Sequence, residues 1–228
     1  MARYVDAPAT RRDVAAAADP FSILLVISQP NDLNILDVEG EERLIREALD
    51  ERVVAGQVAL DTLTDARTKA VVHRLRERAY SAVHFIGHGC FDEGQGHIAL
   101  VGEDGDAEWL DDASLADMFL GNRHTGLVVL NSCEGTEAST TEVFAGTAPR
   151  LVRRGIPAVV AMQWTIRDDT AKVFADEFYR TVALGWPVDA AMQSARSAIS
   201  IRIGMRRRDF ATPVLYMRAK DGVIFRPK

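Results

Sequence analysis

The chain has 228 residues, an apolar fraction of 47% and a net charge of −6, which fits an ordinary globular domain and argues against direct nucleic-acid binding, because phosphate needs a basic surface. No apolar run approaches the roughly 18 residues of a membrane helix, and two cysteines cannot build a disulfide framework. We therefore expect a reduced, cytoplasmic protein without a membrane partner.

Residues 1–20 are predicted to form a polar leader that is partly disordered. The segment is rich in alanine, but Asp6, Asp13 and Asp19 interrupt it, so it lacks the apolar centre of a signal peptide. Residues 21–228 contain neither an internal repeat nor a linker, and one domain is expected there.

Short apolar runs alternate along this domain with stretches of helical apolar spacing. The runs predict core strands at residues 22–28, 57–63, 82–86, 127–130, 158–162 and 214–216. The spacing predicts helices at residues 39–54, 64–79, 111–120, 143–154, 168–183 and 188–203. A glycine-rich loop is expected at 87–96 and a hairpin at 98–110. This alternation predicts an α/β fold with a mainly parallel sheet and helices on both faces.

A cysteine and a histidine each follow a predicted core strand. Cys133 comes after the strand at 127–130, and His88, 45 residues earlier, comes after the strand at 82–86. If the strands are neighbours, thiol and imidazole face each other at the edge where catalytic groups collect in parallel sheets. A lone cysteine usually fills space, but a thiolate needs a nearby base, and His88 is placed to be one.

Glycines beside these two residues leave room for a substrate. Gly87 and Gly89 flank His88, and Gly135 follows Cys133 closely. The N–H groups of Gly89 and Cys133 are expected to hold the oxyanion of a tetrahedral intermediate, where one such donor is worth roughly 3 kcal/mol.

Metal binding is not expected. His88, Cys90, His97 and Cys133 have the side chains of metal ligands, but their spacing matches no compact zinc pattern. Cys90 is interpreted as a small loop residue.

Three segments, in this order, resemble the CHAT domains, which are caspase-like cysteine peptidases of clan CD related to caspases and separase. They are HFIGHG at 84–89, VVLNSCEG at 128–135 and GIPAVVAMQW at 155–164. The resemblance extends from about residue 23 to residue 216. It implies the caspase-like three-layer sandwich and an endopeptidase that cleaves a protein substrate with a His88/Cys133 dyad and no cofactor.

The resemblance also implies a role in bacterial signalling or defence. CHAT domains often lie beside sensor domains, so the activating sensor is expected to be another protein or another part of a longer chain. The rival interpretation is a catalytically silent interaction module that keeps the caspase-like scaffold. A flavodoxin-like domain would explain the alternating elements but not the two strand-end motifs.

Substrate specificity is assigned through separase, in which the segment after the fifth strand supplies an Asp that pairs with arginine. The resemblance places Asp168 in that role, with Glu134 as a further acidic group and Trp164 as a wall. Such a pocket favours Arg or Lys before the scissile bond. Two alternatives stay open: Asp168 caps its helix, and Trp164 packs in the core. Arg167 departs from a purely acidic pocket.

Overall fold

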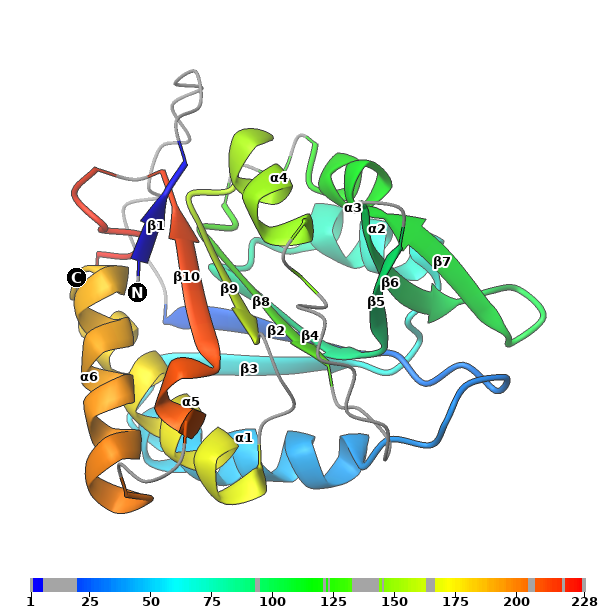
Figure 1. Cartoon of the computed structure of the whole chain (residues 1–228). Coiled ribbons are helices and arrows are strands. Elements are labelled where there is room, and N and C mark those ends of the chain that lie inside the picture. Colours follow the sequence, from blue (N-terminus) through cyan, green and yellow to red (C-terminus); the bar gives the residue numbers. More distant parts are fainter. Residues whose placement is uncertain are drawn as a thin grey trace.

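A computed structural model describes residues 2–5, 20–92, 95–120, 122, 124–132, 144, 146–162, 167–204, 208–218 and 220–226, with the backbone alone at residues 91, 132, 168 and 208. A central sheet lies between two layers of helices, and a small second sheet packs beside it (Figure 1). The expected three-layer α/β sandwich is confirmed.

Within the described residues, the main sheet has seven strands in the order β1-β10-β9-β8-β4-β2-β3. The strands are β1 (Ala2–Tyr4), β2 (Phe21–Ile27), β3 (Val58–Leu63), β4 (Ala82–Gly87), β8 (Leu127–Ser132), β9 (Ala158–Met162) and β10 (Pro213–Met217). Strands β3, β2, β4, β8 and β9 are parallel to one another. Strand β10 is antiparallel to β9, and β1 pairs in parallel with β10. Strand β1 was not predicted, because three residues are too short for a periodic pattern.

The second sheet consists of β5 (Gly89–Asp92), β6 (Gln95–Val101) and β7 (Ala107–Asp111), paired antiparallel in that order. The predicted loop at 87–96 is therefore wrong, because Gly89–Asp92 continues the chain as an edge strand against β6. Gly96 allows β6 to pack closely against Thr147, since a Cβ at position 96 would collide with the Thr147 hydroxyl.

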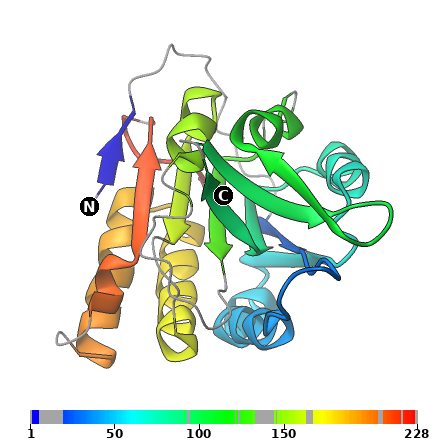
Figure 2. The ribbon, with the colours of Figure 1, turned by 45° about the vertical axis from the view of Figure 1, so that its right-hand side comes forward.

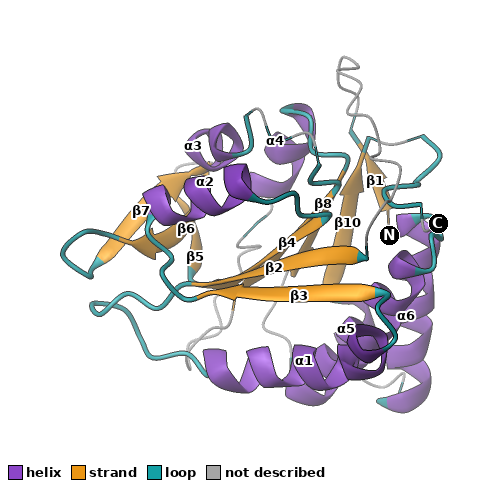
Figure 3. Cartoon of the chain, turned by 180° about the vertical axis from the view of Figure 1, so that it is seen from behind, coloured by secondary structure: helices purple, strands orange, loops and turns teal. Residues whose placement is uncertain are grey.

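In the part of the chain that the structure describes, three helices cover each face of the main sheet. Figure 2 shows α1 (Val38–Val54), α5 (Asp168–Ala183) and α6 (Val188–Arg202) along one face. Figure 3 shows α2 (Thr68–Glu77), α3 (Asp112–Met118) and α4 (Thr147–Arg153) along the other. Side chains alternate across a strand, so Leu25 packs with the first layer and Leu24 with the second. Each face thus buries its own apolar core.

Helix boundaries follow the predictions where apolar spacing defines them. Helix α5 has the predicted bounds. Helix α2 begins at Thr68 instead of near Thr64, and its N-cap is Arg67, whose guanidinium binds the Asp65 carboxylate at 2.7 and 2.6 Å. Helix α4 begins at Thr147 instead of residue 143. It ends before Gly155, whose φ of 111° suits glycine.

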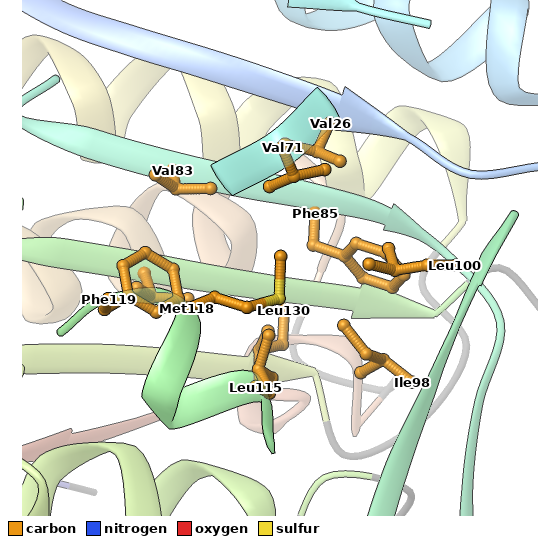
Figure 4. Close-up of a pocket in the computed structure, with 11 residues that line it drawn as sticks. Val26, Val71, Val83, Phe85, Ile98, Leu100, Leu115, Met118, Phe119 and Leu130 are labelled. Atoms are coloured by element: carbon orange, nitrogen blue, oxygen red, sulfur yellow. The ribbon is translucent and has the colours of Figure 1, made fainter. Parts of the chain in front are cut away.

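An apolar pocket remains in the second core, between the sheet and helices α2 and α3 (Figure 4). Its lining has no polar surface. The residues that line it include Val26, Val71, Ile98, Met118 and Leu130.

Candidate active site

The candidate site lies beside the point where the order of strands reverses, which falls between β2 and β4. From β2 the chain goes through α1 to β3 on one side, whereas β4 lies on the other side of β2. Helix α1 packs on one face of the sheet, and the segment after β4 leads to β6 and α3 on the opposite face. The connections after β2 and β4 therefore diverge, and ligands of open α/β sheets bind at such a switch point.

The strands that precede the predicted dyad are hydrogen-bonded neighbours. Strands β4 and β8 run parallel, and Gly87 pairs with Ser132. His88 directly follows Gly87, and Cys133 directly follows Ser132 in the sequence. Cys133 itself lies outside the described residues. The two strands are therefore neighbours, as the prediction requires. The pair formed by Gly87 and Ser132 immediately precedes the two predicted dyad residues in the sequence.

His88 is half-buried and is held by the connection after β2. Its Nε2 lies 2.9 Å from the backbone oxygen of Asn34. A carbonyl oxygen only accepts hydrogen bonds, so Nε2 carries the hydrogen, and Nδ1 is the ring nitrogen that can take up a proton. The backbone oxygen of His88 accepts a 3.0 Å hydrogen bond from Ala99 N–H, which fixes the residue to β6.

The side chain of Gln29 braces the loop that carries Asn34. Its Nε2 donates to the backbone oxygen of Asn34 at 3.1 Å, and its Oε1 accepts from Leu36 N–H at 2.9 Å. Ile35 lies between these two anchored residues with 91% of its surface exposed. The loop therefore presents a large apolar side chain to solvent one residue from the contact with His88.

The N–H of Gly89 points away from β6. The hydrogen bond from Ala99 N–H to the His88 oxygen makes Gly89 and Ile98 the non-hydrogen-bonded pair of the antiparallel ladder. Strand β5 is the edge of its sheet. Within the described residues this N–H has no partner, which an oxyanion donor requires.

The residues predicted to bind substrate are described only in part. Glu134 and Trp164 lie outside the described residues. The backbone of Asp168 is the first helical position of α5, and the N-cap is Arg167, which differs from the alternative in which Asp168 is the cap. Arg167 Nε lies 3.4 Å from Asp169 Oδ1, with both side chains largely exposed.

A buried polar cluster of Glu41, His84, Asn131 and Tyr179 lies in the core below the strand ends, and sequence analysis did not predict it. Asn131 Nδ2 donates to Glu41 Oε1. His84 Nδ1 lies 2.8 Å from the Tyr179 hydroxyl, and its Nε2 lies 4.0 Å from Glu41 Oε1. Burial lowers the pKa of His84 to about 3, so the imidazole is neutral. Burial, with the charge of Glu41, raises the pKa of Tyr179.

A sequence signal for this cluster existed. His84 interrupts the apolar run of β4, and Asn131 follows the apolar run of β8 directly. The predicted strand ends at residue 130, but β8 continues through Ser132, and Asn131 pairs with Ile86. Residues two apart share a face of a strand, so Ile86 lies on the same face as His84.

Cys90 lies in β5, not in a loop as predicted. Burial, and next the charge of Asp92, raise the pKa of its thiol. An activated cysteine has a lowered pKa, so Cys90 lacks the environment of a nucleophile. Among the described residues, no cluster of three or more His, Cys, Asp or Glu side chains could hold a metal ion.

Comparison with known proteins gives one family and a common fold. The family model of the CHAT domain matches residues 2–205. Saccharomyces cerevisiae separase, solved in a complex with securin, superposes with a TM-score of 0.50 at 14% identity, over 94% of this chain and 12% of the separase chain. The Drosophila initiator caspase Dronc gives a TM-score of 0.46 at 10% identity, over 87% of this chain and 84% of the caspase.

These likenesses concern the fold, which is caspase-like. The chain spans about an eighth of the length of the separase chain, since it covers 12% of it. A search of curated proteins gave no match. In the part of the chain that the structure describes, no helix has the length and apolar character to cross a bilayer. Family and fold together suggest a peptidase-like function.

Proposed function

Because the chain belongs to the CHAT domain family, we propose that it is a cysteine endopeptidase that cleaves a partner protein. The observation that carries the proposal is the pairing of Gly87 with Ser132. In the sequence, His88 directly follows the first residue of this pair and Cys133 directly follows the second. No cofactor takes part in the proposed reaction.

In the proposed reaction, Nδ1 of His88 accepts the proton of the Cys133 thiol, and the thiolate attacks the peptide carbonyl carbon. The N–H groups of Gly89 and Cys133 hold the oxyanion. His88 gives the proton to the leaving amine as the C–N bond breaks, and a thioester remains. Water, deprotonated by His88, then hydrolyses the thioester, releases the acid and restores the thiol.

The contact between His88 and Asn34 supports this role. Asn34 accepts from Nε2 at 2.9 Å, which leaves Nδ1 as the base and fixes the plane of the ring. The carbonyl also stabilises the imidazolium that forms when Nδ1 takes up the thiol proton, because a positively charged donor strengthens a hydrogen bond.

We propose that Asp168, Glu134 and Trp164 form the pocket for an Arg or Lys side chain before the scissile bond. In support, β9 pairs in parallel with β8, so the two strands end at the same edge of the sheet, and in the sequence Trp164 follows β9 as Cys133 follows β8. Asp169 lies beside Arg167 and offsets part of the charge that would oppose a basic substrate.

The physiological role proposed from the family is cleavage of a partner protein in bacterial signalling or defence, in the cytoplasm. A sensor protein would control it. The separase of the structural comparison was solved with securin bound, and that association belongs to separase alone.

The test is a panel of fluorogenic peptides that differ only in the residue before the scissile bond: Arg, Lys, Asp, Leu and Ala. We expect turnover of Arg and Lys peptides, with loss of activity in Cys133→Ala and His88→Ala and loss of the basic preference in Asp168→Ala. Turnover of Leu or Asp peptides instead would retain the dyad and reject the acidic pocket.

Alkylation with iodoacetamide separates a latent enzyme from a silent interaction module. An activated Cys133 should react faster than Cys90, whose pKa burial raises, and His88→Ala should slow Cys133 alone. Equal rates at both cysteines, together with no turnover, would reject the peptidase in favour of the module.

A further inference from the structure

The cluster of Glu41, Asn131, His84 and Tyr179 takes no part in the proposed reaction, yet it lies below the strands that carry the site. Glu41 is 7% exposed and Asn131 is 2% exposed. Their surroundings are the apolar residues of the first core, such as Ile86 and Val129. Burying a carboxyl group and an amide costs free energy unless they are hydrogen-bonded, so the contact between these two side chains offsets part of the cost of burying them.

The contact joins helix α1 to the end of β8. Asn131 Nδ2 donates to Glu41 Oε1, and Asn131 is two residues before Cys133. Glu41 belongs to α1, and Asn131 lies in the last part of β8. Helix α1 therefore holds the last part of the strand that leads to the proposed nucleophile.

The same short segment also reaches the histidine. Asn34, which binds His88, is seven residues before Glu41. Between them, Asp37 caps helix α1 by accepting from Gly40 N–H at 3.0 Å. A Cβ at Gly40 would collide with the Asp37 carboxylate, so this turn is tightly packed. Segment 34–41 thus contacts the His88 side of the site at one end and the β8 side at the other.

We propose that Glu41 is a positioning residue that, through Asn131, sets the end of β8 relative to the Asn34–His88 contact. The inference rests on the proposed function for its catalytic consequence, because the two strand ends carry the proposed dyad. Its structural part, the anchoring of β8 by α1, stands independently of activity. Glu41 touches neither reacting atom and acts through the geometry of its neighbours.

The contact predicts which substitutions matter. Glu41→Gln keeps an oxygen that can accept from Asn131, whereas Glu41→Ala removes it and leaves a buried donor unpaired. Asn131→Ala removes the other partner. Because the two residues act through one hydrogen bond, the effects of Glu41→Ala and Asn131→Ala should be strongly non-additive in the double variant.

Glu177 provides a matched control. It is a buried glutamate of similar exposure, 9%, and it accepts from Ser194 and Arg180 where α5 meets α6. Neither of these partners belongs to the strands of the site. Glu177→Ala therefore reports the cost of losing a buried carboxylate contact away from the strand ends.

The experiment measures amide hydrogen exchange across β8 together with kcat and KM on the best peptide of the panel. We expect Glu41→Ala to speed exchange at the end of β8 and to lower kcat at least tenfold with KM within twofold. The fold-decrease in kcat should be the same for every peptide that is turned over, whichever residue precedes the scissile bond. Glu41→Gln should recover most of the loss, and Glu177→Ala should leave both readouts at their wild-type values.

Three results would overturn the inference. Unchanged exchange at the end of β8 in Glu41→Ala would remove the anchor, whether or not the protein is a peptidase. A decrease in kcat that differs between the Arg and the Lys peptide would make Glu41 a selector of substrate. An equal loss of kcat in Glu177→Ala would reduce the effect to general destabilisation. If wild type shows no turnover and Cys133 is alkylated no faster than Cys90, the proposed function fails, and exchange in the folded Glu41→Gln and Glu41→Ala variants still decides the anchor.

Discussion

The Ser28 hydroxyl donates a 2.7 Å hydrogen bond to the backbone oxygen of Ala99. Ser28 is fully buried just beyond the end of β2, and Ala99 lies in β6. Ala99 in turn donates its N–H to the backbone oxygen of His88. The position of His88 therefore depends on a hydrogen bond between the two sheets.

Replacing Ser28 by alanine should affect both stability and catalysis. Ser28→Ala leaves the buried oxygen of Ala99 without this donor, which should cost about 1–2 kcal/mol of unfolding free energy. It should also lower kcat several-fold, because β6 can shift with His88 attached. Urea unfolding and peptide turnover provide the two measurements.

Ser22→Ala is the matched control for Ser28→Ala. Ser22 lies near the other end of β2, where its hydroxyl donates to the backbone oxygen of Ala79 at 3.1 Å. This variant should lose stability with kcat unchanged. If both serine variants lost the same fraction of kcat, Ser28 would have no special role in placing His88.

Ile35→Ser should lower kcat/KM for peptides that carry an apolar residue near the scissile bond. Ile35 is 91% exposed on the braced loop next to Asn34, so its loss should leave the melting temperature unchanged and lower kcat/KM severalfold for such peptides. Ile201→Ser, which removes an isoleucine 83% exposed on α6, should change neither value. Identical kcat/KM for wild type and Ile35→Ser on every peptide would contradict this expectation.

Acidification should destabilise the protein through His84. Its pKa is about 3 in the folded chain against 6.5 for an ordinary histidine, so the unfolded chain binds the proton first. The contribution of neutral His84 to the free energy of unfolding is complete above pH 6.5 and is lost as the pH falls toward 3. The loss should be on the order of 1 kcal/mol per pH unit within that window.

His84→Gln removes this titration and leaves a neutral side chain beside Tyr179 and Glu41. Urea unfolding of wild type and variant at several pH values between 7 and 4 gives two curves of stability against pH. The wild-type curve should be the steeper one. Parallel curves would mean that His84 takes up no fewer protons in the folded chain than in the unfolded chain.

Filling the apolar pocket should stabilise the protein. Val71→Ile adds one methylene group to a residue that lines the pocket, and cavity filling commonly adds about 0.5–2 kcal/mol. Val129→Ile makes the same change in the other core, where Val129 is fully buried away from the pocket. Overpacking there should cost about 1–3 kcal/mol. Opposite shifts of the urea midpoint are the expected result, and shifts of the same sign would contradict it.

The main layers could be predicted because strands buried on both faces are continuous apolar runs. The run at 158–162 coincides with β9, and the helix predicted at 168–183 coincides with α5. The placement of His88 after a core strand followed from the same signal. Patterns of this kind are local, and a single sequence contains them in full.

The features that could not be predicted depend on contacts between distant residues. Strand β5 exists because Gly89–Asp92 pairs with β6, although its glycine content indicates a loop. Asn34 has a role through its backbone oxygen, which no side-chain pattern reveals. Glu41 and Asn131 are 90 residues apart, and each alone reads as an ordinary helix or turn residue.

Strand β1 covers the outer edge of β10 with three exposed residues. Val5 N–H adds a 3.0 Å hydrogen bond to the Met217 oxygen, and the Arg3 guanidinium lies 3.2 Å from the Tyr216 hydroxyl. Without β1, the fully buried residues of β10 would border an open row of backbone donors and acceptors. Such a row is a template on which strands of other molecules can add. Residues 2–5 therefore occupy the backbone edge of β10, and removing them would open that edge to strands of other molecules.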